Sequence, residues 1–428
     1  MHPTRRQALA AAVAAAVPFA RPAPAADDLP TTGPADKRLA SFDDLLTRFV
    51  AEHKIPGASL AVTKDGKLVY ARGYGVAVVG EKRPVQPTSL FRIASISKPI
   101  TAVGVLQLAE RKKLKLDDPV LDHLTLEAFV PKGAKPDPRW KQITVRHCLQ
   151  HTGGWDRDKS GDPCFKIWQI AKEMSTETPV PPDQIVRYML GQPLDADPGT
   201  KYAYSNLGYL VLGAIVEAVT KQTYEEFVLK SVFAPLKITE PKLCRVFPAD
   251  RPKTEVGYAD ANKKTGRCLY PPKRGEQVPF PDGAMNVESF AAHGGWVASA
   301  VDLVRFAAAL DYGRKSPLLA EESIAAMWAP PAGEPGHGKD GKAKAVYYGC
   351  GWQVRPQGKG RANAWHTGLI PGTSTLLVRR HDGLNWAVLF NTDRTPDGKT
   401  VLAGLIDGPL HAAADAVKEW PTEEPKLG

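Results

Sequence analysis

The order of strand-like and helix-like patterns along the chain constrains its fold more than any other feature of the sequence. β-Branched and aromatic residues mark two strands at 59–63 and 68–74, and Asp65-Gly66 between them is a hairpin-turn signal. Strand patterns return only near the C-terminus, at 347–354, 362–365, 374–379 and 386–391. The interior has helical periodicity, at 96–111, 143–151, 183–191, 207–220, 223–232, 299–311 and 320–328.

Strands at both ends of one chain predict that the two ends meet in one sheet. We therefore expect an α+β fold: an antiparallel β-sheet made by the N- and C-terminal segments, flanking helices at 37–53 and 399–419, and an inserted, mostly helical lobe. The expected boundaries are 37–94 and 345–420 for the sheet lobe and 95–344 for the helical lobe, together one catalytic domain. The first flanking helix has an apolar face made by Leu39, Phe42, Leu45, Leu46 and Phe49. Two stretches, 155–182 and 245–295, are poor in regular pattern, which is typical of lids and specificity elements.

Residues 1–26 have the order of an export signal peptide. Arg5 and Arg6 precede an apolar stretch at 8–20, and small residues at 22–26 follow it. The arginine pair favours the twin-arginine route, and an ordinary secretory signal is the alternative. We expect the signal to be removed and the protein to be exported, to a periplasmic or extracellular location.

The charge balance gives no support to a nucleic-acid partner. The signal holds three of the 56 Lys and Arg residues and none of the 46 Asp and Glu residues, so the rest of the chain carries a mild +7. The longest apolar run outside the signal, 207–219, is shorter than the roughly 20 residues of a membrane span, so we expect no transmembrane segment in the mature chain. The densest basic patch lacks an aromatic platform, and we interpret it as a solvated loop; its residues are Lys263, Lys264, Arg267, Lys273 and Arg274.

Five cysteines are too few for a disulfide-dense scaffold, and their odd number leaves at least one thiol unpaired in a monomer. The nearest pairs are Cys148 with Cys164 and Cys244 with Cys268, and export would allow both to form disulfides. The alternative is that Cys148 packs as an apolar side chain inside a helix. No Cys-x-x-Cys occurs, so cysteine spacing supports no zinc or redox site.

The segment Ser95-Ile96-Ser97-Lys98-Pro99 is the strongest candidate for chemistry. Proline is tolerated only in the first turn of a helix, so the helix begins close to Ser95, and Ser95 and Lys98 project from one face of that turn. A hydroxyl nucleophile needs a base within hydrogen-bond reach, and the amine supplies it. Lys98 acts as a neutral base near pH 7 only if burial or a basic neighbour lowers its pKa by about 3, which requires about 4 kcal/mol. The alternative is Ser95 as a helix N-cap and Lys98 as a surface charge.

Tyr204 and Asn206 form the second candidate pair. They stand two residues apart in an extended segment just before the helix at 207, so their side chains point the same way. We expect a tyrosine beside Lys98 to lose its proton more easily and to relay protons between Ser95 and a leaving group. The alternatives are an N-cap role for Asn206 and a core position for Tyr204.

Three His-x-Gly segments begin at His151, His293 and His366, and only His366 lies at the end of a strand with another strand shortly after it. That strand would flank a cleft and offer a backbone N–H as a second oxyanion donor. Thr367 would then be placed to hydrogen-bond a substrate carboxylate or carbonyl. We interpret His151 as a turn residue that ends the preceding helix.

Jointly, these motifs resemble those of the penicillin-recognising serine hydrolases, on the side of the class C β-lactamases. The matching segments are 91–99, 143–154, 198–206, 294–303, 348–352 and 366–372, and the resemblance spans about residues 40–395. It implies an active site at the junction of sheet and helical lobe, acylation of Ser95, and Lys98 with Tyr204 as the proton-handling pair. The backbone N–H groups of Ser95 and Leu369 would form the oxyanion hole. The substrate-binding residues it implies are Asn206, His366, Thr367, Gly368 and Leu369.

The resemblance implies no metal and no cofactor, and a small-molecule ester, amide or peptide as the partner. Class C β-lactamases have lysine where this chain has His366, and histidine is more typical of the esterase, D-aminopeptidase and penicillin-binding-like members. A neutral histidine lacks the charge that holds a β-lactam carboxylate, so we expect esters or amides to be better substrates than β-lactams. Protonation of His366 below about pH 6 would restore some carboxylate binding. Leu369 stands where the family usually has a small residue, which narrows the cleft.

Two alternatives within the same family stay open, a true β-lactamase and a slow-turnover penicillin-binding or D,D-peptidase protein. A serine hydrolase of the nucleophile-elbow type has no support, because no Gly-x-Ser-x-Gly occurs.

Overall fold

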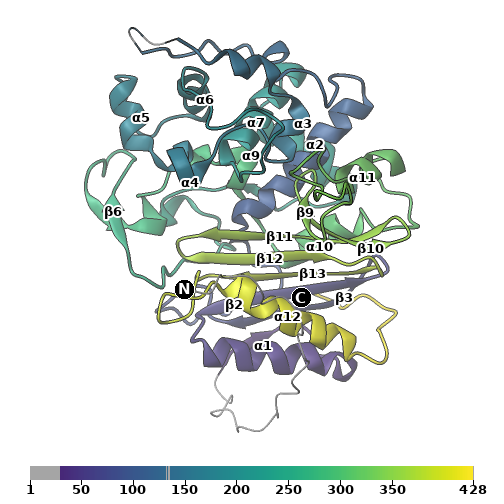
Figure 1. Cartoon of the computed structure of the whole chain (residues 1–428). Coiled ribbons are helices and arrows are strands. Elements are labelled where there is room, and N and C mark those ends of the chain that lie inside the picture. Colours follow the sequence, from purple (N-terminus) through teal and green to yellow (C-terminus); the bar gives the residue numbers. More distant parts are fainter. Residues whose placement is uncertain (1–28, 132, 134, 428) are drawn as a thin grey trace, which may run out of the picture.

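The computed structural model describes residues 29–131, 133 and 135–427, and its centre is an eight-stranded sheet (Figure 1). The strand order is β1-β3-β2-β13-β12-β11-β10-β9, and every neighbouring pair is antiparallel. The strands are β1 (Thr31–Thr32), β2 (Gly57–Lys64), β3 (Lys67–Gly75), β9 (Tyr347–Tyr348), β10 (Gln353–Gly358), β11 (Arg361–Ile370), β12 (Thr373–Arg379) and β13 (Leu384–Phe390). β2 pairs with β13, so the two ends of the chain meet in the sheet and the predicted α+β fold is confirmed.

The terminal helices α1 (Ala40–Glu52) and α12 (Leu402–Asp415) cover one face of the sheet and lie below it in Figure 1. Alternate residues of β13 face opposite layers, as the period of a strand requires. Trp386 and Val388 pack with α1 and α12, whereas Ala387 and Leu389 belong to the core on the other side. The five residues predicted for the apolar face of the first helix are all buried, which confirms that prediction.

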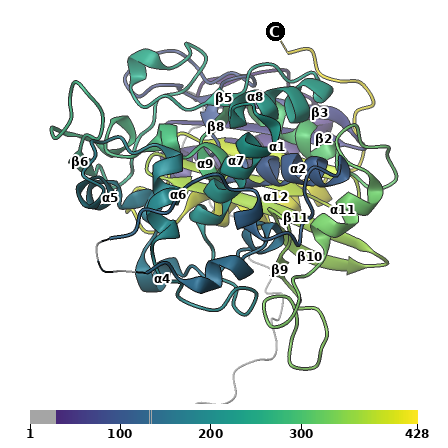
Figure 2. The ribbon, with the colours of Figure 1, turned by 90° about the horizontal axis from the view of Figure 1, so that it is seen from above.

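The opposite face of the sheet carries the helical lobe, seen from above in Figure 2. α10 packs directly on β2 and β13, where the register partners Ala61 and Ala387 have small side chains that let the helix approach closely. α2, α7 and α9 pack against one another within the lobe. The lobe's helices are α2 (Ser97–Glu110), α3 (Val145–Leu149), α4 (Arg157–Ser160), α5 (Ile167–Glu173), α6 (Pro182–Leu190), α7 (Asn206–Thr220), α8 (Tyr224–Val228), α9 (Ala291–Gly294), α10 (Ala300–Ala308) and α11 (Glu321–Trp328).

The strand predicted at 347–354 is wrong in one respect, because it is two strands, β9 and β10, separated by a turn. Gly351 in this turn has a φ of +86°, which favours glycine. A Cβ there would lie 2.7 Å from the Ala102 side chain and 3.1 Å from the Lys98 carbonyl oxygen. The chain turns here because it is pressed against α2, next to the candidate nucleophile.

The two stretches without regular pattern contain short elements. The first, 155–182, holds α4, α5 and the 3-10 turn η5 (Pro163–Phe165), and the second, 245–295, holds α9 and a hairpin of β6 (Thr265–Arg267) and β7 (Gln277–Pro279). Part of the predicted basic loop is therefore a hairpin. Its Arg267 lies 4.0 Å from the centre of the Trp168 ring, an aromatic partner from a distant segment.

β4 (Phe91–Arg92) lies just before the candidate nucleophile in the chain and pairs with β8 (Trp296–Ala298), which also pairs with β5 (Lys242–Leu243) in a three-stranded sheet. None of the helices in the described part of the chain is long and apolar enough to cross a membrane. The predicted export signal at 1–26 lies outside the described residues. The lobe boundaries at 94/95 and 344/345 stay a prediction.

All five cysteines are buried free thiols, so the bridges that export would allow, Cys148–Cys164 and Cys244–Cys268, are not formed. Each of these side chains belongs to the apolar core of the helical lobe. The alternative, packing of Cys148 as a small apolar residue, is confirmed.

Candidate active site

Ser95 lies at the start of a helix, as its sequence context predicts. The chain leaves β4, passes through the 3-10 turn η2 (Ala94–Ile96) and enters α2 at Ser97, so Pro99 falls in the first turn of α2. Ala94 has a φ of 46°, a left-handed conformation that is rare for a residue with a Cβ and that bends the backbone just before Ser95. Neither η2 nor α2 has a side-chain cap, so the N-cap alternative for Ser95 is wrong.

Lys98 is fully buried, so the surface-charge alternative is also wrong. Its Nζ lies 3.2 Å from Ser95 Oγ, 2.7 Å from Asn206 Oδ1 and 2.8 Å from the His293 carbonyl oxygen. These three contacts match the three hydrogens of an ammonium group. When Lys98 is neutral, the amide and carbonyl oxygens still accept its two N–H groups, and its lone pair is left facing Ser95 Oγ.

Burial lowers the pKa of Lys98 to about 7, which confirms the change that a neutral base requires. Two charged neighbours modify this effect. Asp162 favours the ammonium form and opposes the fall of the pKa, whereas Arg157 is the basic neighbour that adds to it. Near neutral pH, a substantial fraction of the Lys98 side chains is therefore unprotonated.

Asn206 holds Lys98 from the side away from the cavity. The N-cap of α7 is Ser205, whose Oγ accepts a hydrogen bond from the Gly208 N–H, so the N-cap alternative for Asn206 is wrong. Asn206 Nδ2 donates to Asp162 Oδ2 at 2.7 Å while its Oδ1 accepts from Lys98. Both ends of this amide are used inside the protein, and Asn206 does not line the cavity, in contrast to the substrate contact that the resemblance implies.

Tyr204 lies beside both Lys98 and Ser95. The Lys98 Nζ is 4.7 Å from the centre of the Tyr204 ring, and the Tyr204 side chain lies close enough to Ser95 for the Ser95 hydroxyl to affect its pKa. The spacing argument that places Tyr204 and Asn206 together is confirmed, because both contact Lys98. The expectation that Tyr204 loses its proton easily is wrong: burial raises the pKa of Tyr204 well above its usual value, since the phenolate would lose its solvation. Tyr204 is therefore a neutral O–H donor.

A cavity of about 600 Å³ opens at Ser95 between the helical lobe and the sheet. The helical lobe contributes Ser95, residues 156–158 and residues 201–204. The sheet contributes its outer strands β9, β10 and β11. Their lining residues are Tyr348, Gln353, Trp365, His366, Thr367 and Leu369.

His366 is buried in this wall and is neutral. Its Nδ1 donates to the Thr367 carbonyl oxygen at 2.7 Å, because a carbonyl only accepts, and its Nε2 then accepts from the Tyr348 hydroxyl at 2.9 Å. Burial, assisted by the charge of Lys98, lowers the pKa of His366 to about 3. The prediction that His366 becomes protonated below about pH 6 is therefore wrong.

The remaining predicted residues alternate along β11. Thr367 and Leu369 line the cavity, and Leu369 is 39% exposed. Gly368 points the other way, where a Cβ would collide with the Ile93 carbonyl oxygen and the Thr375 hydroxyl. Gly368 thus does not line the cavity; it lets β11 lie directly against the segment that carries Ser95.

The structure adds residues that the sequence patterns did not assign to the site. His151 has a φ of 57° and ends the turn after α3 as predicted, but it is also fully buried, and its ring centre is 4.3 Å from that of Tyr204. Its Nδ1 accepts from the Ser205 N–H at 3.2 Å, which fixes the ring against Tyr204. Arg157 and Asp162 come from the stretch 155–182, whose lack of pattern was the only signal. The described ranges contain no cluster of three or more His, Cys, Asp or Glu side chains arranged to hold a metal ion.

Comparisons with known proteins agree with this geometry. Penicillin-binding protein 4* of Bacillus subtilis (strain 168) is 30% identical over 384 residues, which cover 88% of this chain and 76% of the relative. The octameric penicillin-binding protein homologue from Pyrococcus abyssi is 25% identical, with a TM-score of 0.63 over 86% of this chain and 76% of that one. The D-amino acid amidase from Ochrobactrum anthropi SV3, 23% identical, shares the fold, with a TM-score of 0.66 over 90% of this chain and 99% of the amidase.

The sequence also matches the Beta-lactamase family over residues 42–407, a range that contains Ser95, Lys98, Tyr204 and His366. This chain therefore belongs to the Beta-lactamase family, and its enzyme class is that of the family's serine hydrolases.

Proposed function

We propose that this protein hydrolyses small esters, amides or peptides through an acyl-enzyme on Ser95. The observation that carries the proposal is the set of contacts around Lys98. The Asn206 Oδ1 and the His293 carbonyl oxygen can only accept hydrogen bonds, so they hold two N–H groups of Lys98. The third position on the Lys98 nitrogen points toward Ser95 Oγ at 3.2 Å and is the one available to take a proton. A buried amine whose pKa is about 7 is suited to that transfer near neutral pH.

In the acylation step, Lys98 takes the proton of Ser95 while Oγ attacks the substrate carbonyl carbon. The resulting oxyanion is stabilised by the backbone N–H groups of Ser95 and Leu369. Collapse of this intermediate breaks the bond to the leaving group. The proton held by Lys98 and the O–H of Tyr204 together supply the proton that the leaving group takes up. In deacylation, water attacks the ester on Ser95 and the same pair returns the proton to Oγ.

Esters and amides are the preferred substrates within this proposal. The class C β-lactamases that the sequence resembles have lysine at the position of His366, and this histidine is held neutral by burial. The β11 wall therefore offers a β-lactam carboxylate no cation. Loss of a charge-assisted hydrogen bond costs about 1.5–3 kcal/mol, or about ten- to a hundredfold in recognition.

A second candidate is a protein that penicillin acylates but that deacylates slowly, which the name of the Bacillus relative favours. Both candidates need Ser95 and Lys98. They are separated by the deacylation rate, measured as the recovery of ester hydrolysis after a stoichiometric dose of penicillin.

Ser95→Ala tests the proposal directly. A fluorophosphonate probe should label the wild type on Ser95 and leave the variant unlabelled, and ester hydrolysis should fall by a factor on the order of 10⁴–10⁶. Ser97→Ala, two residues away, is the matched control and should keep the label. Label that persists in Ser95→Ala on Ser97 or Ser205 would move the nucleophile and refute the assignment.

We also propose that the protein acts after export, because residues 1–26 have the order of a signal peptide. The substrate would then be met in the periplasm or outside the cell.

A further inference from the structure

The cavity is lined by two cations that the proposed chemistry does not use, Arg157 and Lys201. Arg157, the first residue of α4, lines the cavity together with Ser95. Its guanidinium lies 4.7 Å from the centre of the Tyr204 ring, and Lys98 Nζ, which is 3.2 Å from Ser95 Oγ, lies 4.7 Å from the centre of the same ring. The sum of these three distances places the guanidinium within about 13 Å of Ser95 Oγ.

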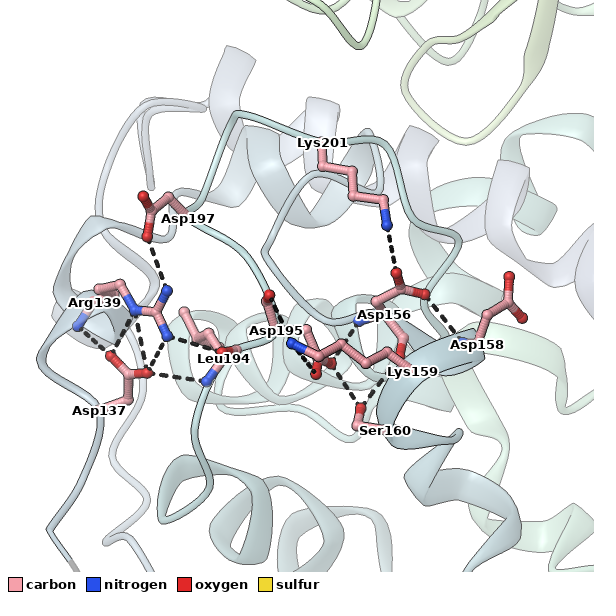
Figure 3. A network of polar contacts seen from close by, with 10 residues as sticks. All are labelled: Asp137, Arg139, Asp156, Asp158, Lys159, Ser160, Leu194, Asp195, Asp197 and Lys201. Carbon is pink, nitrogen blue, oxygen red and sulfur yellow. Dashed lines mark hydrogen bonds and ion pairs between the residues drawn. The ribbon is translucent and has the colours of Figure 1, made fainter.

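Arg157 lacks a partner for its charge. Among the described residues it forms no ion pair, and its contact with Tyr204 is through the ring face. The other cation of the cavity, Lys201, is already paired with Asp156 at 2.6 Å (Figure 3). A guanidinium presents a planar fork of donors that matches a carboxylate in bidentate geometry, and here that fork is unused.

The charge of Arg157 affects the pKa of side chains near Ser95. Burial is the main cause of the low pKa of Lys98, and Arg157 lowers it further. Burial likewise raises the pKa of Tyr202 to about 12, and Arg157 opposes that rise. The exposed carboxylate of Asp158, which lines the same cavity, does not affect the pKa of Lys98 or of Tyr202. It contributes to the raised pKa of Lys201.

The backbone that carries Arg157 is fixed on both sides (Figure 3). The Asp195 carboxylate accepts hydrogen bonds from the Asp156 N–H at 2.9 Å and from the Ser160 hydroxyl at 2.7 Å, one at each end of α4. Lys201 ties Asp156 to the segment that leads into Tyr204. A cation on an anchored segment is pre-organised, so little ordering is lost when it binds a ligand.

We propose that Arg157 is a carboxylate-binding residue, and that this enzyme prefers esters or amides that carry an acidic group near the scissile bond. The proposal rests on the proposed function, because it names the substrate class of the same cavity. In this proposal the group that binds the substrate carboxylate lies on the cavity wall formed by the helical lobe. It does not lie on the facing β11 wall, where His366 is neutral. The four charged residues that line this end of the cavity, Asp156, Arg157, Asp158 and Lys201, sum to zero, and Arg157 is the cation among them that forms no ion pair with a carboxylate in the described part of the chain.

The test compares matched esters that differ only in charge. With the carboxylate on the leaving group, the pair is 3-acetoxybenzoate and its methyl ester; with the carboxylate on the acyl group, it is phenyl 4-carboxybenzoate and its methyl ester. The readout is the ratio of kcat/KM for the charged and the neutral member, which cancels any effect of a variant on the pKa of Lys98. The wild type should prefer the charged member in at least one pair.

Arg157→Gln should lower that ratio about tenfold, the low end for a charge-assisted contact because Arg157 is exposed. Arg157→Lys should recover part of it by keeping the charge without the fork. Lys159→Met is the matched control: it removes a cation from the same helix, two residues from Arg157, but one that does not line the cavity, so the ratio should change by less than about twofold.

An unchanged ratio in Arg157→Gln, or an equal fall in Arg157→Gln and Lys159→Met, would overturn the inference. If Ser95 is labelled by a fluorophosphonate and the neutral esters are hydrolysed while the ratio does not move, only the carboxylate site fails. If none of the four esters is hydrolysed in a Ser95-dependent way, the proposed function fails, and the carboxylate site fails with it.

Discussion

Asp162→Asn should shift the pH dependence of this enzyme to lower pH. Asp162 contacts Lys98 through a single bridging side chain, because Asn206 accepts from Lys98 and donates to Asp162, each at 2.7 Å. The carboxylate favours the ammonium form of Lys98, so removing its charge lowers the pKa of Lys98 below about 7. Asparagine keeps the shape of the side chain and one oxygen that accepts from Asn206 Nδ2, so the bridge to Lys98 is preserved, whereas the bond that the other carboxylate oxygen accepts from the Cys164 N–H is lost.

The size of the shift follows from the distance. Two hydrogen bonds and the width of one amide place the carboxylate within about 8 Å of the Lys98 Nζ. At an effective dielectric constant of about 20, a unit charge at that distance contributes about 2 kcal/mol, equivalent to about 1.5 in pKa. Asp162 is only half-buried, and solvent screening reduces the expected fall to about 1.

The assay is kcat/KM for a neutral ester between pH 5 and 9, because kcat/KM reports the ionisation of the free enzyme. Activity rises with pH as Lys98 becomes neutral, so the midpoint of the rise should move from about pH 7 to about pH 6. At pH 6 the variant should reach about half of its plateau, against about a tenth for the wild type. The plateau itself should fall modestly, since a less basic amine is a weaker proton acceptor.

Asp158→Asn is the control, because Asp158 lines the same cavity but does not affect the pKa of Lys98. It should leave the midpoint in place. A midpoint that does not move in Asp162→Asn, or that moves to higher pH, would show that the group titrating in the rate profile is not Lys98 coupled to this carboxylate.

Three further outcomes are expected. Tyr204→Phe should slow amides much more than 4-nitrophenyl esters, whose leaving group needs no proton; equal losses on both would exclude Tyr204 as the donor. His366→Lys should raise cephalosporin hydrolysis relative to ester hydrolysis, and the gain should be larger at pH 6 than at pH 8. The reason is that the burial that lowers the pKa of His366 also lowers the pKa of a lysine at this position. A gain independent of pH would contradict this reasoning. N-terminal sequencing of exported protein should find a start near Asp27, and Arg5→Lys/Arg6→Lys should block export; normal export of that variant would favour the ordinary secretory route.

The sequence was sufficient for features that depend on neighbours along the chain. Strand patterns at both ends predicted the shared sheet, and the spacing of Ser95, Lys98 and Pro99 predicted one helical turn with both side chains on one face. The fall in the Lys98 pKa was also foreseeable, since the chemistry requires it.

Features that depend on burial by distant segments were not predictable in the same way. A nearby cation suggests a lowered pKa for Tyr204, and a solvated His366 would be protonated near pH 6. Burial instead raises the pKa of Tyr204 and lowers that of His366. The path from Asp162 through Asn206 to Lys98 joins three separate segments. No periodicity marks such a path, because hydrogen bonds between loops leave no repeat in the sequence.

The pairing of β2 with β13 bears on how this enzyme is made. The Gly57 N–H at the start of β2 donates to the Asn391 side chain just after β13, 334 residues further along the chain. While the ribosome is still translating the interior, β2 is therefore an unpaired edge, a segment prone to mispairing with other chains. The nascent chain already contains Ser95 and Lys98, but it lacks β11 and with it one wall of the cavity. A hydrolase built this way is inert until almost its last strand has been synthesised.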